Sequence, residues 1–193
     1  MENPKYVKIN NKKYKINTDF RIALECNEIS LNENIGEYEK ILAIIYKLYG
    51  EEALDCPEDY EKLIELGQKY LLLGKEEDEN NQNNIVDMDF IEDMDYIKAS
   101  FMSDYNIDLE GKEMHWWTFC NLLNGLSNSE LGNCCILNKI RNLRNYDTSQ
   151  IKDSKTRTEI EKAKKMVELK RNKKQPTTKQ QESMNKAYEL LGL

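Results

Sequence analysis

Proline and glycine are scarce in this chain, with three prolines and eight glycines among 193 residues. This scarcity favours helices over a β fold interrupted by many tight turns. Long apolar runs are also missing, because runs such as LAII and YLLL fall far short of the roughly 20 residues that cross a bilayer. Apolar residues make up 39% and charged residues 33% of the chain, so we expect a soluble protein with one core domain and no membrane partner.

Residues that usually carry chemistry are few. His115 is the only histidine, and the five cysteines show no CxxC or CxxH spacing of a zinc site. The amino terminus, MENPKYVKINNKKYK, lacks the apolar segment of a signal peptide, so we expect a cytoplasmic protein with reduced thiols. We expect no catalytic residue, no metal and no cofactor.

Charge is distributed unevenly along the chain. Residues 51–113 hold 20 Asp and Glu against 5 Lys, whereas residues 151–193 hold 12 Lys and Arg against 6 Asp and Glu. The acidic body argues against general nucleic-acid binding, although the segment KRNKK at 170–174 keeps a nucleic-acid-binding regulator among the alternatives. We expect a core domain over residues 1–150 and a basic helical extension over residues 151–193.

The first elements follow from short-range patterns. Apolar and basic residues alternate in YVKI and KYKI on either side of Asn10 and Asn11, which tolerate positive φ, and this predicts a β-hairpin. Thr18 is then the expected N-cap of a helix that runs to about Ile29. Apolar spacings of three and four predict a second helix that ends at Gly50.

Further helices are expected beyond this point. Pro57 and Gly74 mark the start and end of the third helix. The segment KEEDENNQNN has no apolar residue, which predicts an acidic flexible loop over residues 75–86. Later helices are expected to begin at Asp87 or Asp89, near residue 114, near SNSE at residues 127–130, at about residue 154 and at about residue 179. The predicted fold is mainly α, a bundle of six to seven helices with a short amino-terminal β-hairpin.

Several apolar side chains are expected to form the core, because they share helix faces at the spacing of a helical turn. The strongest stripe belongs to the helix after the acidic loop, whereas Glu92 and Asp93 beside it are interpreted as a solvated pair. The expected core residues are Phe90, Met94, Ile97, Phe101, Trp116, Phe119, Leu123 and Ile140.

The segment MHWWTFCNLL, residues 114–123, combines His115, both tryptophans and Cys120. His115 and Cys120 are five residues apart, about 140° around a helix, so they cannot readily form a catalytic dyad with each other. Trp116 shares the apolar face with Cys120, while Trp117 points about 100° away toward the side of Asn121. Trp117 is therefore a candidate contact for a partner, although two packed helices would bury both indoles equally well.

Together these segments resemble the bacteriophage gene-product-fifteen family, small proteins encoded among the tail genes of tailed phages and prophages. The resemblance rests on DMDFIEDMDYIKASFMSDYNIDL, MHWWTFCNLLNGL, KIRNLRNYD and the opening NTDFR, and it spans most of the chain. The matching positions are residues 17–21, Asp89, Phe90, Asp93, Ile97, Phe101, Tyr105, Ile107, Asp108, Leu109, His115, Trp116, Trp117, Phe119, Leu122, Leu123, Leu126, Ile140 and Arg141.

The resemblance implies a non-enzymatic role in tail morphogenesis inside the bacterial host cell. We expect a tail assembly chaperone that binds the tape-measure protein and helps to recruit tail-tube subunits, with homo-oligomerisation as a further expectation. A structural or adaptor subunit of the tail is the alternative. The residues expected to contact a partner are Trp117, His115, Asn121 and Tyr105.

Overall fold

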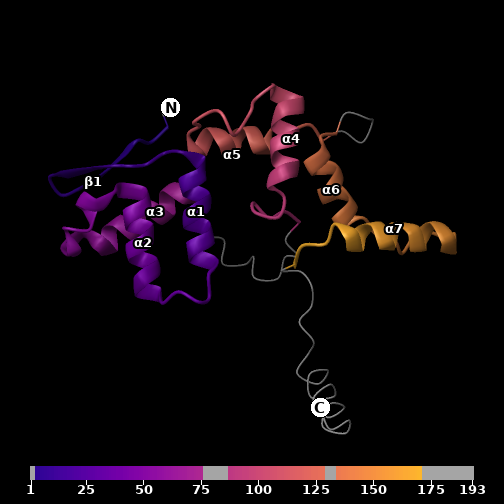
Figure 1. Ribbon diagram of the computed structural model, residues 1–193, viewed down its shortest axis with the longest axis horizontal. Coiled ribbons are helices and arrows are strands. Elements are labelled where there is room, and N and C mark those ends of the chain that lie inside the picture. The colour runs from indigo at the N-terminus through magenta and orange to yellow at the C-terminus, as the bar shows by residue number, and fades with distance from the viewer. Residues whose placement is uncertain (1–2, 76–86, 129–133, 171–193) are drawn as a thin grey trace, which may run out of the picture.

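The computed structural model describes residues 3–75, 87–128 and 134–170, and the predicted mainly α fold is confirmed. Within these residues lie seven α-helices and one two-stranded antiparallel sheet. Figure 1 shows an elongated arrangement, in which the hairpin and helices α1, α2 and α3 occupy one end and helices α4, α6 and α7 the other. We call residues 3–75 the amino-terminal half and the described residues from 87 to 170 the carboxy-terminal half.

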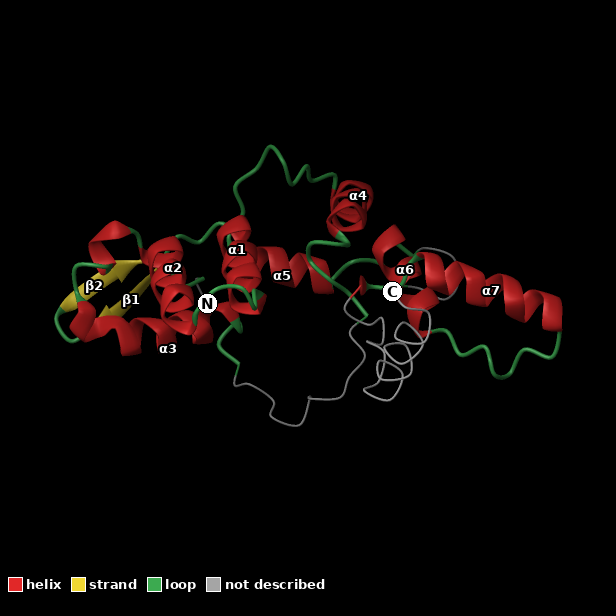
Figure 2. Cartoon of the chain, turned by 60° about the horizontal axis from the view of Figure 1, so that its bottom comes forward, coloured by secondary structure: helices red, strands yellow, loops and turns green. Residues whose placement is uncertain are grey.

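The predicted hairpin is confirmed and consists of β1, Tyr6–Ile9, and β2, Lys12–Lys15. Asn10 in the turn has a φ of 51°, the left-handed conformation that an asparagine tolerates. One face of the ribbon, with Ile9 and Tyr14 buried, packs into a small core that includes Ile45 and Leu63. Figure 2 shows the two strands beside α2 and α3, so the opposite face points away from the helices.

Helix α1 spans Phe20–Leu31, and its N-cap is Asp19 rather than the predicted Thr18. The Asp19 carboxylate accepts a hydrogen bond from the backbone N–H of Arg21 at 2.9 Å. Thr18 lies one residue too early, where its backbone carbonyl already accepts from Trp116. Helix α2, Glu37–Tyr49, ends as expected at Gly50, whose φ of 84° is readily adopted only by glycine.

The third predicted helix begins with a 3₁₀ turn. Residues Glu51–Ala53 and Pro57–Asp59 form two short 3₁₀ helices, η1 and η2, and α3 follows over Tyr60–Leu71. Gly74 comes after its last turn with a φ of 76°. Apart from residue 75, the predicted acidic loop and the predicted helix at 179–191 lie outside the described residues.

Two helices begin later than their sequence patterns suggest. Helix α4 spans Met94–Tyr105, because the Asp89 carboxylate accepts from the backbone N–H groups of Ile91 and Glu92 and so stabilises a turn before the helix. Helix α6 spans Ile136–Asn145 instead of starting near residue 127. Helices α5, Trp116–Asn124, and α7, Ser154–Met166, begin where expected, although α7 ends before the expected residue 171.

The main core lies where α5 meets α1 and α4. Phe119 on α5 is fully buried and stacks on Phe20 of α1 at 4.5 Å and on Phe101 of α4 at 5.3 Å between ring centroids. These stacked rings join the two halves through one continuous apolar cluster. Among the described residues, no helix is long and apolar enough to span a membrane. The domain boundary at residue 150 stays a prediction.

Candidate functional site

Two segments that stand far apart in the sequence meet at one junction. Residues 17–21, NTDFR, lie antiparallel to residues 114–117, MHWW. The backbone N–H of Phe20 donates to the carbonyl of Met114 at 2.9 Å, and that of Trp116 donates to the carbonyl of Thr18 at 2.8 Å. We call this contact the signature junction, because both of its segments belong to the motifs that carry the family resemblance. Their pairing across the chain was not predicted.

Arg21 extends the signature junction toward α4. Its guanidinium donates to the carbonyl of Leu109 at 2.7 Å and to those of Glu110 and Lys112 at 3.2 Å. It also forms an ion pair with Asp19 at 3.1 Å. One arginine therefore satisfies three carbonyl groups of the turn that precedes the tryptophans. The sequence motif NTDFR contained this residue, but its role depends on a partner about ninety residues away in sequence.

His115 is a packed and fully hydrogen-bonded residue. Its Nδ1 accepts from the backbone N–H of Trp117 at 3.1 Å and so caps α5, and its Nε2 lies 2.9 Å from the carbonyl of Pro4. Since Nδ1 is an acceptor, Nε2 carries the proton and donates to Pro4. The ring also makes an edge contact with Tyr70, at 5.9 Å between centroids. Both nitrogens thus hold structure together.

The two tryptophans both bind the carboxy-terminal end of α3. The indole N–H of Trp116 donates to the carbonyl of Leu71, and that of Trp117 donates to the carbonyl of Tyr70, each at 2.9 Å. These carbonyls belong to the last turn of a helix, which lacks intrahelical donors. Trp116 is buried, while Trp117 is half-buried and stacks on the Tyr70 ring at 6.3 Å. The adjacent indoles therefore connect α5 to α3.

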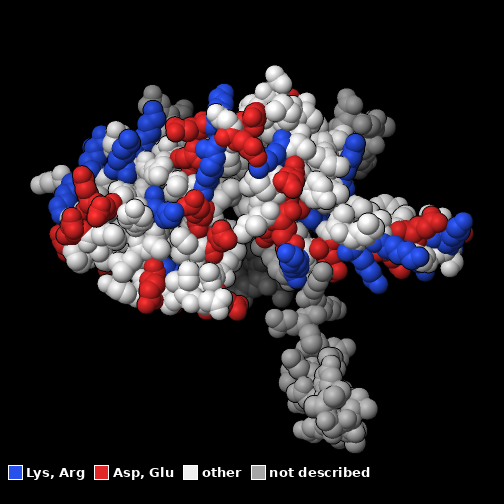
Figure 3. All heavy atoms as spheres, in the orientation of Figure 1, with Lys and Arg blue, Asp and Glu red and all other residues white. Residues whose placement is uncertain are grey.

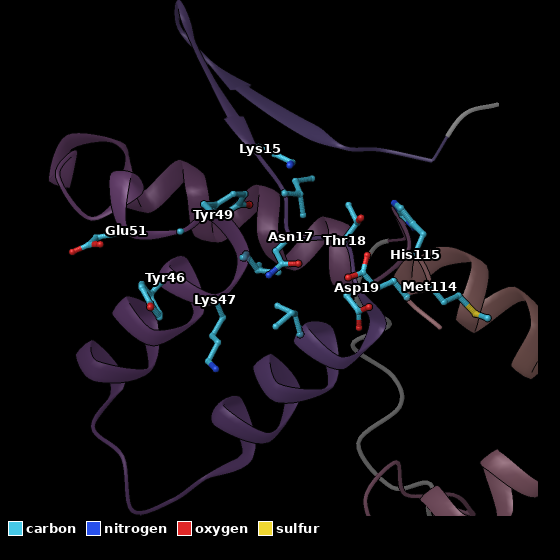
Figure 4. A pocket seen from close by; sticks show the side chains of 15 residues that line it. Lys15, Asn17, Thr18, Asp19, Tyr46, Lys47, Tyr49, Glu51, Met114 and His115 are labelled. Atoms are coloured by element: carbon cyan, nitrogen blue, oxygen red, sulfur yellow. The ribbon is translucent and has the colours of Figure 1, made fainter. Parts of the chain in front are cut away.

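An open hollow of about 880 Å³ lies beside the signature junction. Figure 4 shows its walls: the chain from Lys15 to Asp19, the last turn of α2 with Lys47, and His115 from the start of α5. Its lining carries charges of both signs, and Lys47 is paired with Glu25 at 2.6 Å. Small-molecule pockets are mainly apolar with a few polar groups, so this hollow has little of their character.

Asp93 corrects one sequence interpretation. It was expected to be solvated, but it is fully buried and binds Arg144 of α6 through two hydrogen bonds of 2.7 Å. Arg144 also donates to the backbone carbonyls of Asp87 and Val167. The ion pair with Asp93 raises the pKa of Arg144. This arginine connects the segment before α4, helix α6 and the residue that follows α7. No local sequence pattern predicted that Asp93 and Arg144 form a buried pair.

The remaining predicted residues are the candidate partner contacts and the expected core residues. Tyr105 is half-buried and its hydroxyl donates to the carbonyl of Leu122 at 2.9 Å, whereas the Asn121 side chain is exposed. Trp117 and Asn121 lie on α5, His115 caps it and Tyr105 contacts it from the end of α4, and their predicted contact with a partner stays a prediction. Of the expected core residues, five are buried and three are partly buried. The buried ones are Ile97, Phe101, Trp116, Phe119 and Leu123, and the partly buried ones are Phe90, Met94 and Ile140.

Among the described residues, one group of thiol and carboxylate side chains comes close enough together to hold a metal ion. Cys56, Glu58 and Asp59 place their ligand atoms within 4.8 Å of one another, but Lys12 Nζ lies 3.1 Å from Cys56 Sγ and 3.3 Å from the Glu58 carboxylate. The ammonium group thus supplies the positive charge of this cluster. Burial raises the pKa of the Cys120 thiol to about 12, which keeps it protonated.

Comparisons with known proteins place these features in a family. No curated protein and no solved structure matches the chain. A family model described as Bacteriophage Gp15 protein matches residues 2–169, which include both segments of the signature junction and the Asp93–Arg144 pair. The match covers far more than half of the chain, and the resemblance inferred from the motifs is confirmed. The chain therefore belongs to the bacteriophage Gp15 protein family.

Proposed function

We propose that this protein acts in phage tail morphogenesis as an assembly chaperone, which binds the tape-measure protein and helps to recruit tail-tube subunits. Membership of the bacteriophage Gp15 family over residues 2–169 is the observation that carries the proposal. A tape-measure protein is a long helical client that must stay soluble until the tube encloses it. A non-enzymatic helical protein with apolar contact sites suits that task.

The surface supports reversible binding of a helical client. Ten large apolar or aromatic side chains on the described surface are more than a third exposed, and they lie on several helices and on the hairpin. Such side chains can receive the apolar face of an amphipathic helix. The exposed residues are Tyr6, Leu31, Tyr38, Tyr46, Leu72, Ile91, Met102, Ile136, Tyr146 and Met166.

We place the client on the side of α5 that carries Asn121 and the accessible part of Trp117. Asn121 is exposed, and no side-chain hydrogen bond ties it to the described residues, so a client can contact it without displacing an internal bond. Trp117 offers an indole edge beside it, because its N–H is already used by Tyr70. The polar atoms of Tyr105 and His115 are already hydrogen-bonded within the protein, so these two residues hold the surface in place rather than bind the client through those atoms.

Co-expression with the tape-measure protein encoded in the same tail gene cluster, followed by pull-down, tests the proposal. We expect wild-type protein to keep the client soluble and to co-purify with it. Asn121→Arg should weaken capture, since it places a bulky charge on the proposed surface without removing an internal contact. Glu159→Arg, at an exposed position on α7 whose side chain makes no hydrogen bond or ion pair with the described residues, is the matched control and should leave capture unchanged. Failure of the wild type to bind the client at micromolar concentration would contradict the chaperone role.

The composition of finished particles separates a chaperone from a structural or adaptor subunit. A chaperone leaves the tail when the tube closes, so mass spectrometry of purified particles should detect at most traces of this chain. Stoichiometric amounts in the particle would instead establish the adaptor role.

A further inference from the structure

The outer face of the hairpin is basic and unpaired. Strand register places Tyr6 opposite Lys15 and Lys8 opposite Lys13, so these four side chains share the face that points away from the helices, and all are exposed. Lys13 Nζ lies 3.8 Å from the centre of the Tyr6 ring. None of the three lysines forms an ion pair with another described residue. We call these four residues the basic face.

The end of α1, the connection after it and the first residues of α2 have the opposite character. From residue 22 on α1 to residue 39 on α2 the chain contains five glutamates and no lysine or arginine. Glu28, Glu33 and Glu39 are exposed and make no ion pair within the described part of the chain. Leu31 and Tyr38 between them are 60% and 63% exposed. We call these five residues the acidic tip.

The basic face and the acidic tip lie at opposite sides of the amino-terminal half. Helix α1 starts just after the hairpin, and α2 ends beside it, since Asn17 donates to the carbonyl of Leu48 at 2.7 Å. The tip is therefore one helix length away, about 18 Å for twelve residues. Figure 1 shows the hairpin above these helices and the connection below them. In Figure 3 blue atoms gather along the upper side of this end, while white and red atoms dominate its lower side.

We propose that copies of this chain associate head to tail, with the basic face of one copy against the acidic tip of the next. Three unpaired lysines meet three unpaired carboxylates, and Tyr6 meets the exposed Leu31 and Tyr38. Because the two surfaces differ and lie on opposite sides, the contact leaves one of each free and adds further copies. A contact between a face of four residues and a tip of five residues is small, so we expect weak, salt-sensitive association rather than a permanent dimer. The inference does not depend on the proposed client.

Sedimentation velocity of the full chain tests this arrangement at about 50 mM and about 500 mM salt, which change the screening length about threefold. At low salt we expect the weight-average sedimentation coefficient to rise with protein concentration up to the hundred-micromolar range, and at high salt to stay at the monomer value. A wild-type chain that remains monomeric at low salt overturns the proposal.

Charge-reversed variants identify the two surfaces. Lys8→Glu with Lys13→Glu changes only the basic face, and Glu28→Lys with Glu33→Lys changes only the acidic tip. Each variant alone should associate at least roughly tenfold more weakly than wild type. An equimolar mixture should associate again, because each retains the surface that the other lacks. Lys155→Glu with Lys162→Glu, at exposed positions on α7, is the matched control and should behave as wild type.

The mixing experiment separates this arrangement from its competitors. Circular dichroism of each variant first establishes that the fold is retained, since all four altered positions are exposed. A mixture that stays monomeric would show that the two surfaces do not bind each other. A tip variant that still self-associates but no longer captures the tape-measure protein would assign the tip to the client and overturn the proposal.

Discussion

At the scale of single residues, Arg144 and Asp93 form the most deeply buried ion pair among the described residues. The Arg144 side chain is 9% exposed and that of Asp93 is fully buried. Arg144→Met should lower the free energy of unfolding by about 3–5 kcal/mol, because it leaves the buried Asp93 carboxylate without its charged partner, with only the backbone N–H of Asp89, among the described residues, still donating to it. Urea denaturation followed by circular dichroism measures the change.

Arg141→Met is the control: its pair with Asp87 is about a third exposed and its bond to the Asn138 Oδ1 is a long 3.3 Å, so this variant should lose less stability than Arg144→Met. Equal losses in both variants would contradict the structural importance of the buried pair.

His115 offers a second residue-scale prediction, because its two nitrogens perform different tasks. His115→Ala removes the N-cap of α5 and the bond to Pro4, and should cost about 1–2 kcal/mol. His115→Asn keeps a capping acceptor and should cost less than about 1 kcal/mol. Thermal and urea unfolding of the two variants provide the measurement. If alanine and asparagine were equally destabilising, capping would not be the principal role of this histidine.

Sequence patterns could identify these residues as unusual but could not assign their roles. His115 attracted notice as the only histidine, yet its partners Pro4 and Tyr70 come from other parts of the chain. Asp93 was interpreted as solvated because it stands beside Glu92, and its partner Arg144 is 51 residues away. Local spacing contains no information on such pairs without knowledge of the tertiary fold.

At the scale of elements, Trp116 and Trp117 should contribute unequally to the free energy of unfolding. The indole of Trp116 is the only donor to the Leu71 carbonyl in the described part of the chain, whereas the Tyr70 carbonyl also accepts from the backbone N–H of Leu73. Trp116→Phe should therefore cost about 1–3 kcal/mol and Trp117→Phe about 1 kcal/mol or less. Chemical denaturation monitored by circular dichroism compares them. A larger loss for Trp117→Phe would show that stacking on Tyr70 outweighs the hydrogen bond.

Elements with strong local signals were predicted well, and their exact beginnings less well. The hairpin and the end of α2 at Gly50 depend on turn chemistry within a few residues. The starts of α4 and α6 depend on side chains such as Asp89 and Cys135 that compete for backbone N–H groups. Where two capping candidates stand close together, as with Thr18 and Asp19, tertiary hydrogen bonds decide between them.

At the scale of the whole molecule, buried acids predict a loss of stability in alkali. Burial raises the pKa of Cys26 and of Cys120 from 9.0 to about 12, and it also raises the pKa of Tyr49 and Tyr70. In the unfolded chain these groups ionise at lower pH than in the folded chain. Their stabilising contribution is thus complete below about pH 9 and is lost as pH rises toward 12.

Urea unfolding at a series of pH values under reducing conditions measures this loss. The free energy of unfolding should decline steadily above about pH 9. A variant with Cys26→Ala and Cys120→Ala should show a shallower decline, even if its stability at neutral pH is lower. An identical slope in the variant would show that the thiols do not contribute to the alkaline transition.

The contact between the tryptophans and α3 also has an optical consequence. Both indoles of the chain lie where the amino-terminal half meets α5, with their N–H groups fixed on carbonyls of the same helix. The tryptophan fluorescence of the protein therefore reports on this one boundary. Separation of α3 from α5 would expose both rings to water and shift their emission to the red, so the native protein carries its own fluorescent probe of whether the two halves remain docked when a partner binds.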